Sequence, residues 1–115
     1  MLSTPAERLL DDLFQLSGVE AVLLIDGEGL CTETRPHDLI VGAERSGLLG
    51  ALSAEAALDT EYEVLVASYE GGGCLISPLD GGRSLCAITG IKANVGAVRK
   101  GLIDTTARLR PLIGR

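Results

Sequence analysis

The segment from Asp38 to Asp59 has a helical period, but its apolar residues extend almost all the way round the helix axis. One stripe contains larger side chains: Val41, Leu48, Leu49, Leu52 and Ala56. A second stripe consists mainly of alanine and glycine. Charged side chains occupy only a narrow remainder: Glu44, Arg45, Glu55 and Asp59. Because a surface helix needs one apolar stripe, this helix must be covered on two sides.

A chain of 115 residues forms one domain, which we expect to span residues 1–115. Its own sheet covers one side of the helix, and a second copy of the chain is the best source of the other cover. The alternative is a helix enclosed on both sides within one chain. This segment contains three glycines, Gly42, Gly47 and Gly50. Each costs about 1 kcal/mol relative to alanine inside a helix, so something should compensate for them, and close approach of another backbone would do so.

Two further segments predict helices at the ends of the chain. In "STPAERLLDDLFQLSG", Thr4 is expected to cap the helix, with Pro5 at the first position, Glu7 in a capping box and Gly18 as the stop. Asn94 is expected to open the last helix. Its inward residues would be Val95, Val98, Leu102, Ile103, Thr106 and Leu109.

Five apolar runs predict strands. "VEAVLLIDGEGLCTE" contains two runs around Asp26-Gly27, a strong hairpin signal. "YEVLVASY", "CLISPL" and "SLCAITGI" are joined by two glycine-rich turns, and Pro78 is expected at a strand end. The order is therefore helix, two strands, helix, three strands, helix. Strands linked by hairpins indicate an antiparallel sheet covered by helices, an α+β fold.

Charge is unevenly distributed along the chain. The net charge is −6, made up of −11 in residues 1–70 and +5 in residues 71–115. An acidic protein repels phosphate backbones, so nucleic acid is not an expected partner. The basic last helix is instead expected to pack beside an acidic element of its own fold or of a partner.

The sequence displays little chemistry. Cys31, Cys74 and Cys86 are widely separated along the chain without a CxxC, and His37 has no spaced partner, so we expect reduced, buried thiols and no metal. No phosphate-binding GxxxxGK[ST] and few aromatics occur, so no nucleotide hydrolysis or cofactor is expected. The start, "MLSTPAERLL", lacks the pattern of a signal peptide, and no stretch is apolar enough to span a bilayer, which predicts a cytoplasmic protein.

The chain resembles the Roadblock family, which includes dynein light chains and bacterial gliding regulators. The similarity lies in "VEAVLLIDGEGL", the alanine- and leucine-rich second helix, "YEVLVASYEGGGCLISPLDGGRSLCAITG" and "NVGAVRKGLIDTTARL". It implies a five-stranded antiparallel sheet, with the central helix on one face and the terminal helices on the other. It also implies homodimers in which third strands pair edge to edge and central helices pack together.

Carried onto this sequence, the resemblance implies a specific dimer interface. It would comprise Leu48, Leu49, Leu52, Ala56, Glu63, Val64, Leu65, Val66 and Ala67. Glu44, Arg45 and Glu55 are candidates for contacting another partner. The acidic residues of the first helix, Glu7, Asp11 and Asp12, would lie near the basic last helix.

The resemblance implies a non-enzymatic module that binds and regulates a Ras-like small GTPase, in bacteria and archaea often one of the gliding-motility type. The alternatives are a structural adaptor in a motor or signalling complex and a small-molecule sensor of PAS or profilin-like architecture. An enzyme is the weakest interpretation, because no pair of acidic residues is placed for catalysis. Arg35 and Arg45 could be proposed as arginine fingers, but ordinary surface positions explain both.

Overall fold

A computed structural model describes residues 2–39, 64–69 and 71–113. Its elements, in chain order, are α1 (Thr4–Phe14), β1 (Val19–Ile25), β2 (Cys31–Arg35), β3 (Leu65–Tyr69), β4 (Gly72–Pro78), the short 3₁₀ helix η1 (Asp80–Gly82), β5 (Ser84–Gly90) and α3 (Val95–Ile113). The helix expected up to Asp59 lies outside the described residues from position 40 onward.

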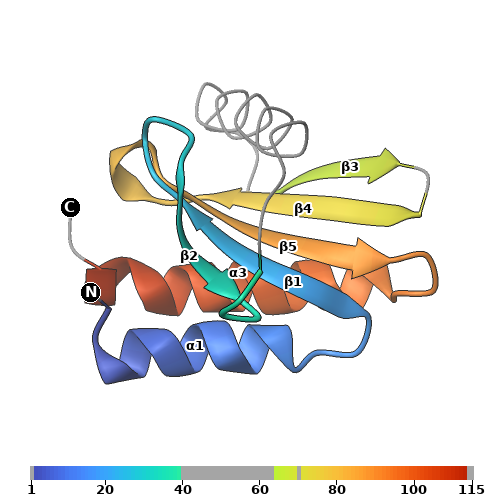
Figure 1. Cartoon of the computed structure of the whole chain (residues 1–115), viewed down its shortest axis with the longest axis horizontal. Helices are drawn as coiled ribbons and strands as arrows, with labels where there is room; N and C mark the ends of the chain where they lie inside the picture. The colour runs from blue at the N-terminus through green and yellow to red at the C-terminus, as the bar shows by residue number, and fades with distance from the viewer. Residues whose placement is uncertain (1, 40–63, 70, 114–115) are drawn as a thin grey trace.

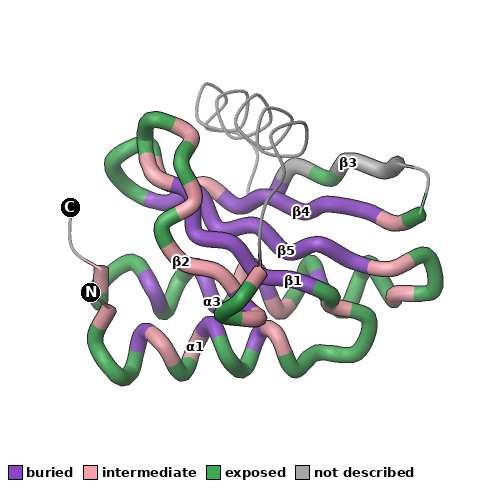
Figure 2. Tube along the Cα trace, viewed as in Figure 1, coloured by how far each residue is buried: buried purple, intermediate pink, exposed green. Residues whose placement is uncertain are grey.

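The described strands form one antiparallel sheet in the order β2-β1-β5-β4-β3 (Figure 1). Strands β1, β5 and β4 each pair on both sides and are mostly buried (Figure 2). They therefore read as nearly continuous apolar runs, as the sequence of β1 does. The α+β class with an antiparallel sheet is confirmed. The predicted place of the central helix falls in residues 40–63 and stays a prediction.

The hairpin turns have local causes. Asp26 accepts hydrogen bonds at its Oδ1 from the backbone N–H groups of Glu28 and Leu30, at 2.9 and 3.0 Å, and so organises the β1–β2 turn. The predicted hairpin is confirmed, with a longer loop than a two-residue turn. Pro78 is the last residue of β4, as expected of a residue that cannot donate to the ladder.

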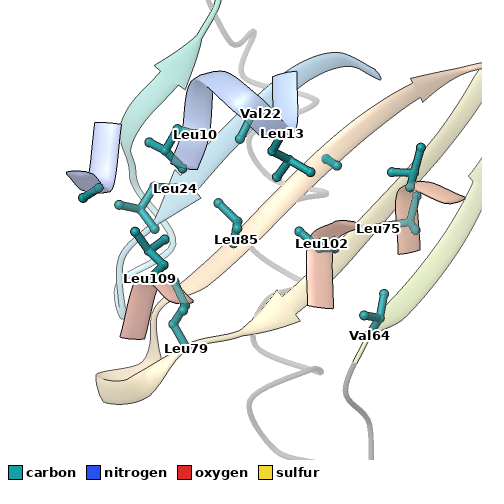
Figure 3. Packing of buried hydrophobic residues seen from close by; sticks show 13 residues of the cluster. Leu10, Leu13, Val22, Leu24, Val64, Leu75, Leu79, Leu85, Leu102 and Leu109 are labelled. Atoms are coloured by element: carbon teal, nitrogen blue, oxygen red, sulfur yellow. The ribbon is translucent and has the colours of Figure 1, made fainter. Parts of the chain in front are cut away.

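The two faces of the sheet carry separate apolar clusters. On one face, side chains of α1 and α3 pack against alternate residues of β1, β4 and β5. Leu10 of α1, Leu102 of α3 and Leu85 of β5 belong to this cluster (Figure 3). On the other face, seven residues of the same strands are also buried: Ala21, Leu23, Ile25, Cys74, Ile76, Cys86 and Ile88. The two terminal helices thus share a face and lie side by side (Figure 1).

Both ends of α1 differ from the prediction: the helix ends at Phe14, with Gln15 as its C-cap, and not at Gly18. Ser3, not Thr4, caps α1, because its Oγ accepts the N–H of Ala6 at 3.4 Å. Glu7 then lies one residue too late for a capping box. Asn94 does open α3, where its Oδ1 accepts the N–H of Ala97 at 3.1 Å.

The inward face of α3 is largely as predicted, with buried Val98, Leu102, Thr106 and Leu109. Val95 was expected inward, but it is 41% exposed, so this part of the prediction is wrong. Thr105 is buried and was missed. Within the described residues, neither helix combines the length and the apolar character needed to cross a bilayer.

Arg35 corrects two expectations. Its side chain is 2% exposed rather than on the surface, and its Nε donates to Asp11 Oδ1 at 2.6 Å. Glu7 and Glu33 lie 3.8 and 3.6 Å from its guanidinium. The acidic side of α1 therefore faces an arginine of β2, not the basic last helix. The two terminal helices meet through apolar atoms instead: a Cβ on Gly101 of α3 would lie 3.9 Å from Leu13 of α1 and 2.5 Å from Leu16, just after that helix.

Candidate protein-interaction edge

Strand β3 forms one edge of the sheet. Its five residues pair with β4 in unbroken register, from Leu65 opposite Ile76 to Tyr69 opposite Gly72. Within the described ranges it has no strand on its other side (Figure 1). An open strand edge presents backbone N–H and C=O groups that another strand can pair with.

The opposite edge of the sheet is differently built. Strand β2 has the sequence CTETR, and its Arg35 connects it to Asp11 of α1. Charged residues and an adjoining helix are the usual means of blocking an edge against further pairing. Strand β3, LVASY, contains no charged residue. Of the two edges, β3 is the one suited to accept another strand.

One apolar side chain of β3 is conspicuously exposed. Val64, just before the strand, is 8% exposed and belongs to the cluster beneath α3. Val66 is two residues further on, so it points to the same face of the sheet, and its backbone lies opposite that of the buried Leu75. Even so, Val66 is 44% exposed. As far as residues 2–39, 64–69 and 71–113 show, the edge thus combines backbone groups that pair with no strand and an exposed apolar side chain.

The predicted interface residues are only partly described. Val64 precedes β3, and Leu65, Val66 and Ala67 lie within it, so these four are together at the open edge. The others lie outside the described residues: Leu48, Leu49, Leu52, Ala56 and Glu63. The candidate partner residues Glu44, Arg45 and Glu55 lie outside them as well.

The structure also reveals a groove that the sequence did not predict. Its volume is about 520 Å³, and it lies between the start of α1 and the end of α3. It is lined by Thr4, Pro5, Arg8, Leu9, Arg108 and Leu112. Arg108 is already 3.3 Å from Asp104. None of the six lining residues is a carboxylate, histidine or thiol, so they provide neither a general base nor a strong nucleophile. The spacing of residues in the sequence does not indicate that Arg8 and Arg108 line one groove, because this depends on how α1 packs against α3.

The three cysteines are thiols. Cys74 and Cys86 are buried, and Cys31 is half-buried, with its pKa raised by burial and then by the nearby charge of Asp26. His37 is exposed in the loop after β2, as expected. No group of three side chains able to hold a metal ion occurs in the part of the chain that is described.

This arrangement of a layered α+β domain with an open sheet edge is the fold of Roadblock/LC7 domains, and the predicted resemblance is confirmed at the level of fold. The Roadblock/LC7 domain from Streptomyces avermitilis matches with a TM-score of 0.67 and 15% identity over 90% of this chain and 93% of its own. MglB from Myxococcus xanthus matches with a TM-score of 0.75 and 16% identity over 94% of each chain. Another matching MglB has a tetrameric arrangement.

The same fold also occurs in a profilin. LokiProfilin2, from a complex with rabbit actin, matches with a TM-score of 0.69 and 18% identity over 97% of this chain and all of its own. No protein-family model and no curated protein sequence matches the chain. At these identities the likeness shows the fold alone.

Proposed function

We propose that the protein is a homodimeric, non-enzymatic interaction module that binds and regulates a Ras-like small GTPase. The observation that carries the first part is the uncharged edge of β3, which has no further strand beside it among the described residues and where Val66 is 44% exposed. Two copies joined along this edge form one continuous sheet. The pairing satisfies the free backbone groups and covers Val66 in both copies.

Three further points support self-association. The predicted helix that includes Leu48, Leu49, Leu52 and Ala56 is apolar on more sides than one chain of this size covers. The edge opposite β3 is blocked by charge, so pairing through β3 is expected to end at two copies rather than continue into a filament. One MglB with the same fold assembles as a tetramer.

Replacing Val66 with glutamate tests the edge. Two-fold pairing brings the two carboxylates close together in a poorly hydrated interface, so we expect self-association to weaken at least about tenfold. Folding stability should change little, because the side chain is already half-exposed in one copy. Sedimentation equilibrium across a concentration series measures the change.

The matched control is Leu30→Glu. Leu30 is 57% exposed in the β1–β2 turn, far along the sheet from β3, so this variant adds the same charge at an exposed apolar site outside the interface. We expect it to associate like the unmodified chain. Equal weakening in both variants, or in neither, would contradict pairing through β3.

The GTPase part of the proposal rests on the fold shared with MglB and on the resemblance of the sequence to Roadblock regulators. The chain lacks a phosphate-binding loop of its own, so any effect on nucleotide turnover comes from binding one switch conformation of a partner more tightly than the other. Arg35, buried against Asp11, is not free to enter a partner's active site. Regulation is therefore expected to act through the partner's conformation and not through Arg35.

A Ras-like GTPase from the same genome provides the test. We expect it to bind this protein with different affinity in its GDP-bound and GTP-analogue-bound forms, and its turnover to change several-fold when the protein is added. Binding with equal affinity for both forms and unchanged turnover would favour the alternative, a structural adaptor. The profilin with this fold, found in a complex with actin, supports that alternative, since there the fold binds a different kind of protein. No binding to either form would contradict the GTPase proposal.

A further inference from the structure

Two of the three thiols are in contact. The Sγ atoms of Cys74 and Cys86 lie 3.0 Å apart in the interior of the sheet layer. Cys74 is 3% exposed and Cys86 is fully buried, and both belong to the apolar cluster on the face opposite α1 and α3. Close contact between two thiols is a feature that neither the dimer edge nor binding to a GTPase requires.

The contact follows from the register of the β4–β5 hairpin. The turn at Asp80–Gly82 places Pro78 opposite Ser84, and the pairing continues without a bulge to Gly72 opposite Gly90. Cys74 is therefore opposite Ile88, and Cys86 is opposite Ile76. The two cysteines are diagonal neighbours on one face of adjacent strands, close enough for their side chains to meet. Their separation in the sequence concealed this.

A disulfide between these residues needs only a small movement. The bond length of a disulfide is about 2.05 Å, so the two sulfur atoms must approach by roughly 1 Å. Diagonal neighbours lie about 7–8 Å apart, slightly beyond the usual Cα separation of a disulfide, so closing the bond also draws the two strands slightly together at this point. The pair is thus positioned for a covalent link inside the folded protein.

We propose that Cys74 and Cys86 are a redox-modification site that forms an intramolecular disulfide with hydrogen peroxide. The thiolate of Cys74, the less completely buried of the two, attacks one peroxide oxygen and breaks the O–O bond. This gives a sulfenic acid and, with the thiol proton, one water. The thiolate of Cys86 then attacks that sulfur and displaces hydroxide, which takes up the second thiol proton as water. Two thiols and one peroxide give one disulfide and two waters.

Cys31 serves as an internal comparison. It packs against the same cluster and is more exposed than either member of the pair, but it has no such sulfur contact among the described residues. Burial and the charge of Asp26 raise the pKa of Cys31, so a smaller fraction is thiolate at neutral pH. The pair is buried more deeply still, so the contact between its sulfur atoms, and not its thiolate fraction, favours its cross-linking. A simple dependence on exposure would make Cys31 the first to oxidise. The proximity of the sulfur atoms predicts that the pair is the one that cross-links.

The test treats the full chain with dilute hydrogen peroxide under native conditions, followed by alkylation in denaturant and peptide mass mapping. We expect loss of two hydrogen atoms per chain and a linked peptide containing Cys74 and Cys86. The cross-linked chain should also melt at a higher temperature than the reduced one, because the bond closes a loop between β4 and β5. Dithiothreitol should reverse both changes.

Two variants test which cysteines form the link. Cys31→Ser should cross-link as the unmodified chain does, and Cys74→Ser should not lose two hydrogen atoms. Should Cys74→Ser fail to fold, Cys86→Ala replaces it, and the peptide map of the unmodified chain still decides. Three results would overturn the proposal. The first is separate alkylation of Cys74 and Cys86 after peroxide treatment, the second is oxygen addition at either one without a link, and the third is a link that involves Cys31.

Discussion

Replacing Gly72 with alanine is expected to lower the free energy of unfolding by about 3 kcal/mol or more, a large fraction of the stability of a domain of this size. A Cβ at this position would lie 2.0 Å from the backbone oxygen of Thr89 and 3.2 Å from its carbonyl carbon. Both atoms belong to β5, which is paired on both sides. Relief therefore requires the β4–β5 ladder to move, not merely a side chain to turn.

The adjacent glycine provides the matched control for this prediction. Gly71 has a φ of +99°, but a Cβ there would meet nothing within 4 Å. Its replacement by alanine carries only the backbone strain, about 1 kcal/mol. Urea unfolding of Gly71→Ala and Gly72→Ala measures both effects. A Gly72→Ala variant no less stable than Gly71→Ala would show that β4 and β5 are not in the close register described above.

Replacing Arg35 with methionine is expected to destabilise the fold by about 2 kcal/mol. Methionine fills most of the volume of the buried side chain, but three carboxylates then lose their shared cation, and the hydrogen bond from Arg35 to the carbonyl of Thr34, at 2.9 Å, is lost. Glu7 and Asp11 are 44% and 52% exposed, so water partly screens them. The loss is therefore smaller than the 3–5 kcal/mol typical of breaking a fully buried pair.

The control for Arg35 is Arg108→Met. Arg108 and Asp104 also form an ion pair, at 3.3 Å, but their side chains are 67% and 61% exposed. Such pairs contribute little, so we expect a change within about 0.5 kcal/mol. Thermal and urea unfolding measure both variants. Equal effects at the two positions would contradict the role of Arg35 in holding β2 against α1.

Patterns within a single element were enough to predict much of the fold. The period of the terminal helices, the Asp26-Gly27 hairpin and the position of Pro78 depend on neighbours within a few residues, so the sequence alone indicates them. The exposed Val66 is different. Its apolar character is visible in the sequence, but its exposure depends on how the elements of the fold pack around β3.

The features that sequence reasoning missed join residues far apart in the chain. Arg35 looked like a surface residue because its partners Glu7 and Asp11 precede it by more than twenty positions. Cys74 and Cys86 looked unrelated until the hairpin register brought them together. In both cases the contact depends on strand register and packing, which the spacing of the residues along the sequence does not specify. The charge asymmetry of the chain is real, but Glu7 and Asp11 pair with Arg35, so the predicted contact of these two residues with the last helix is wrong. An acidic partner for that helix stays a prediction.

The proposed function depends above all on two copies of the chain sharing a sheet edge. Sedimentation equilibrium of the full chain at micromolar concentration measures this directly, because one chain has a mass of 11.9 kDa. We predict a species of twice that mass, with the Val66→Glu variant shifted toward the single-chain value. A well-folded species of 11.9 kDa throughout the concentration range, indifferent to the charge at position 66, would contradict the central claim.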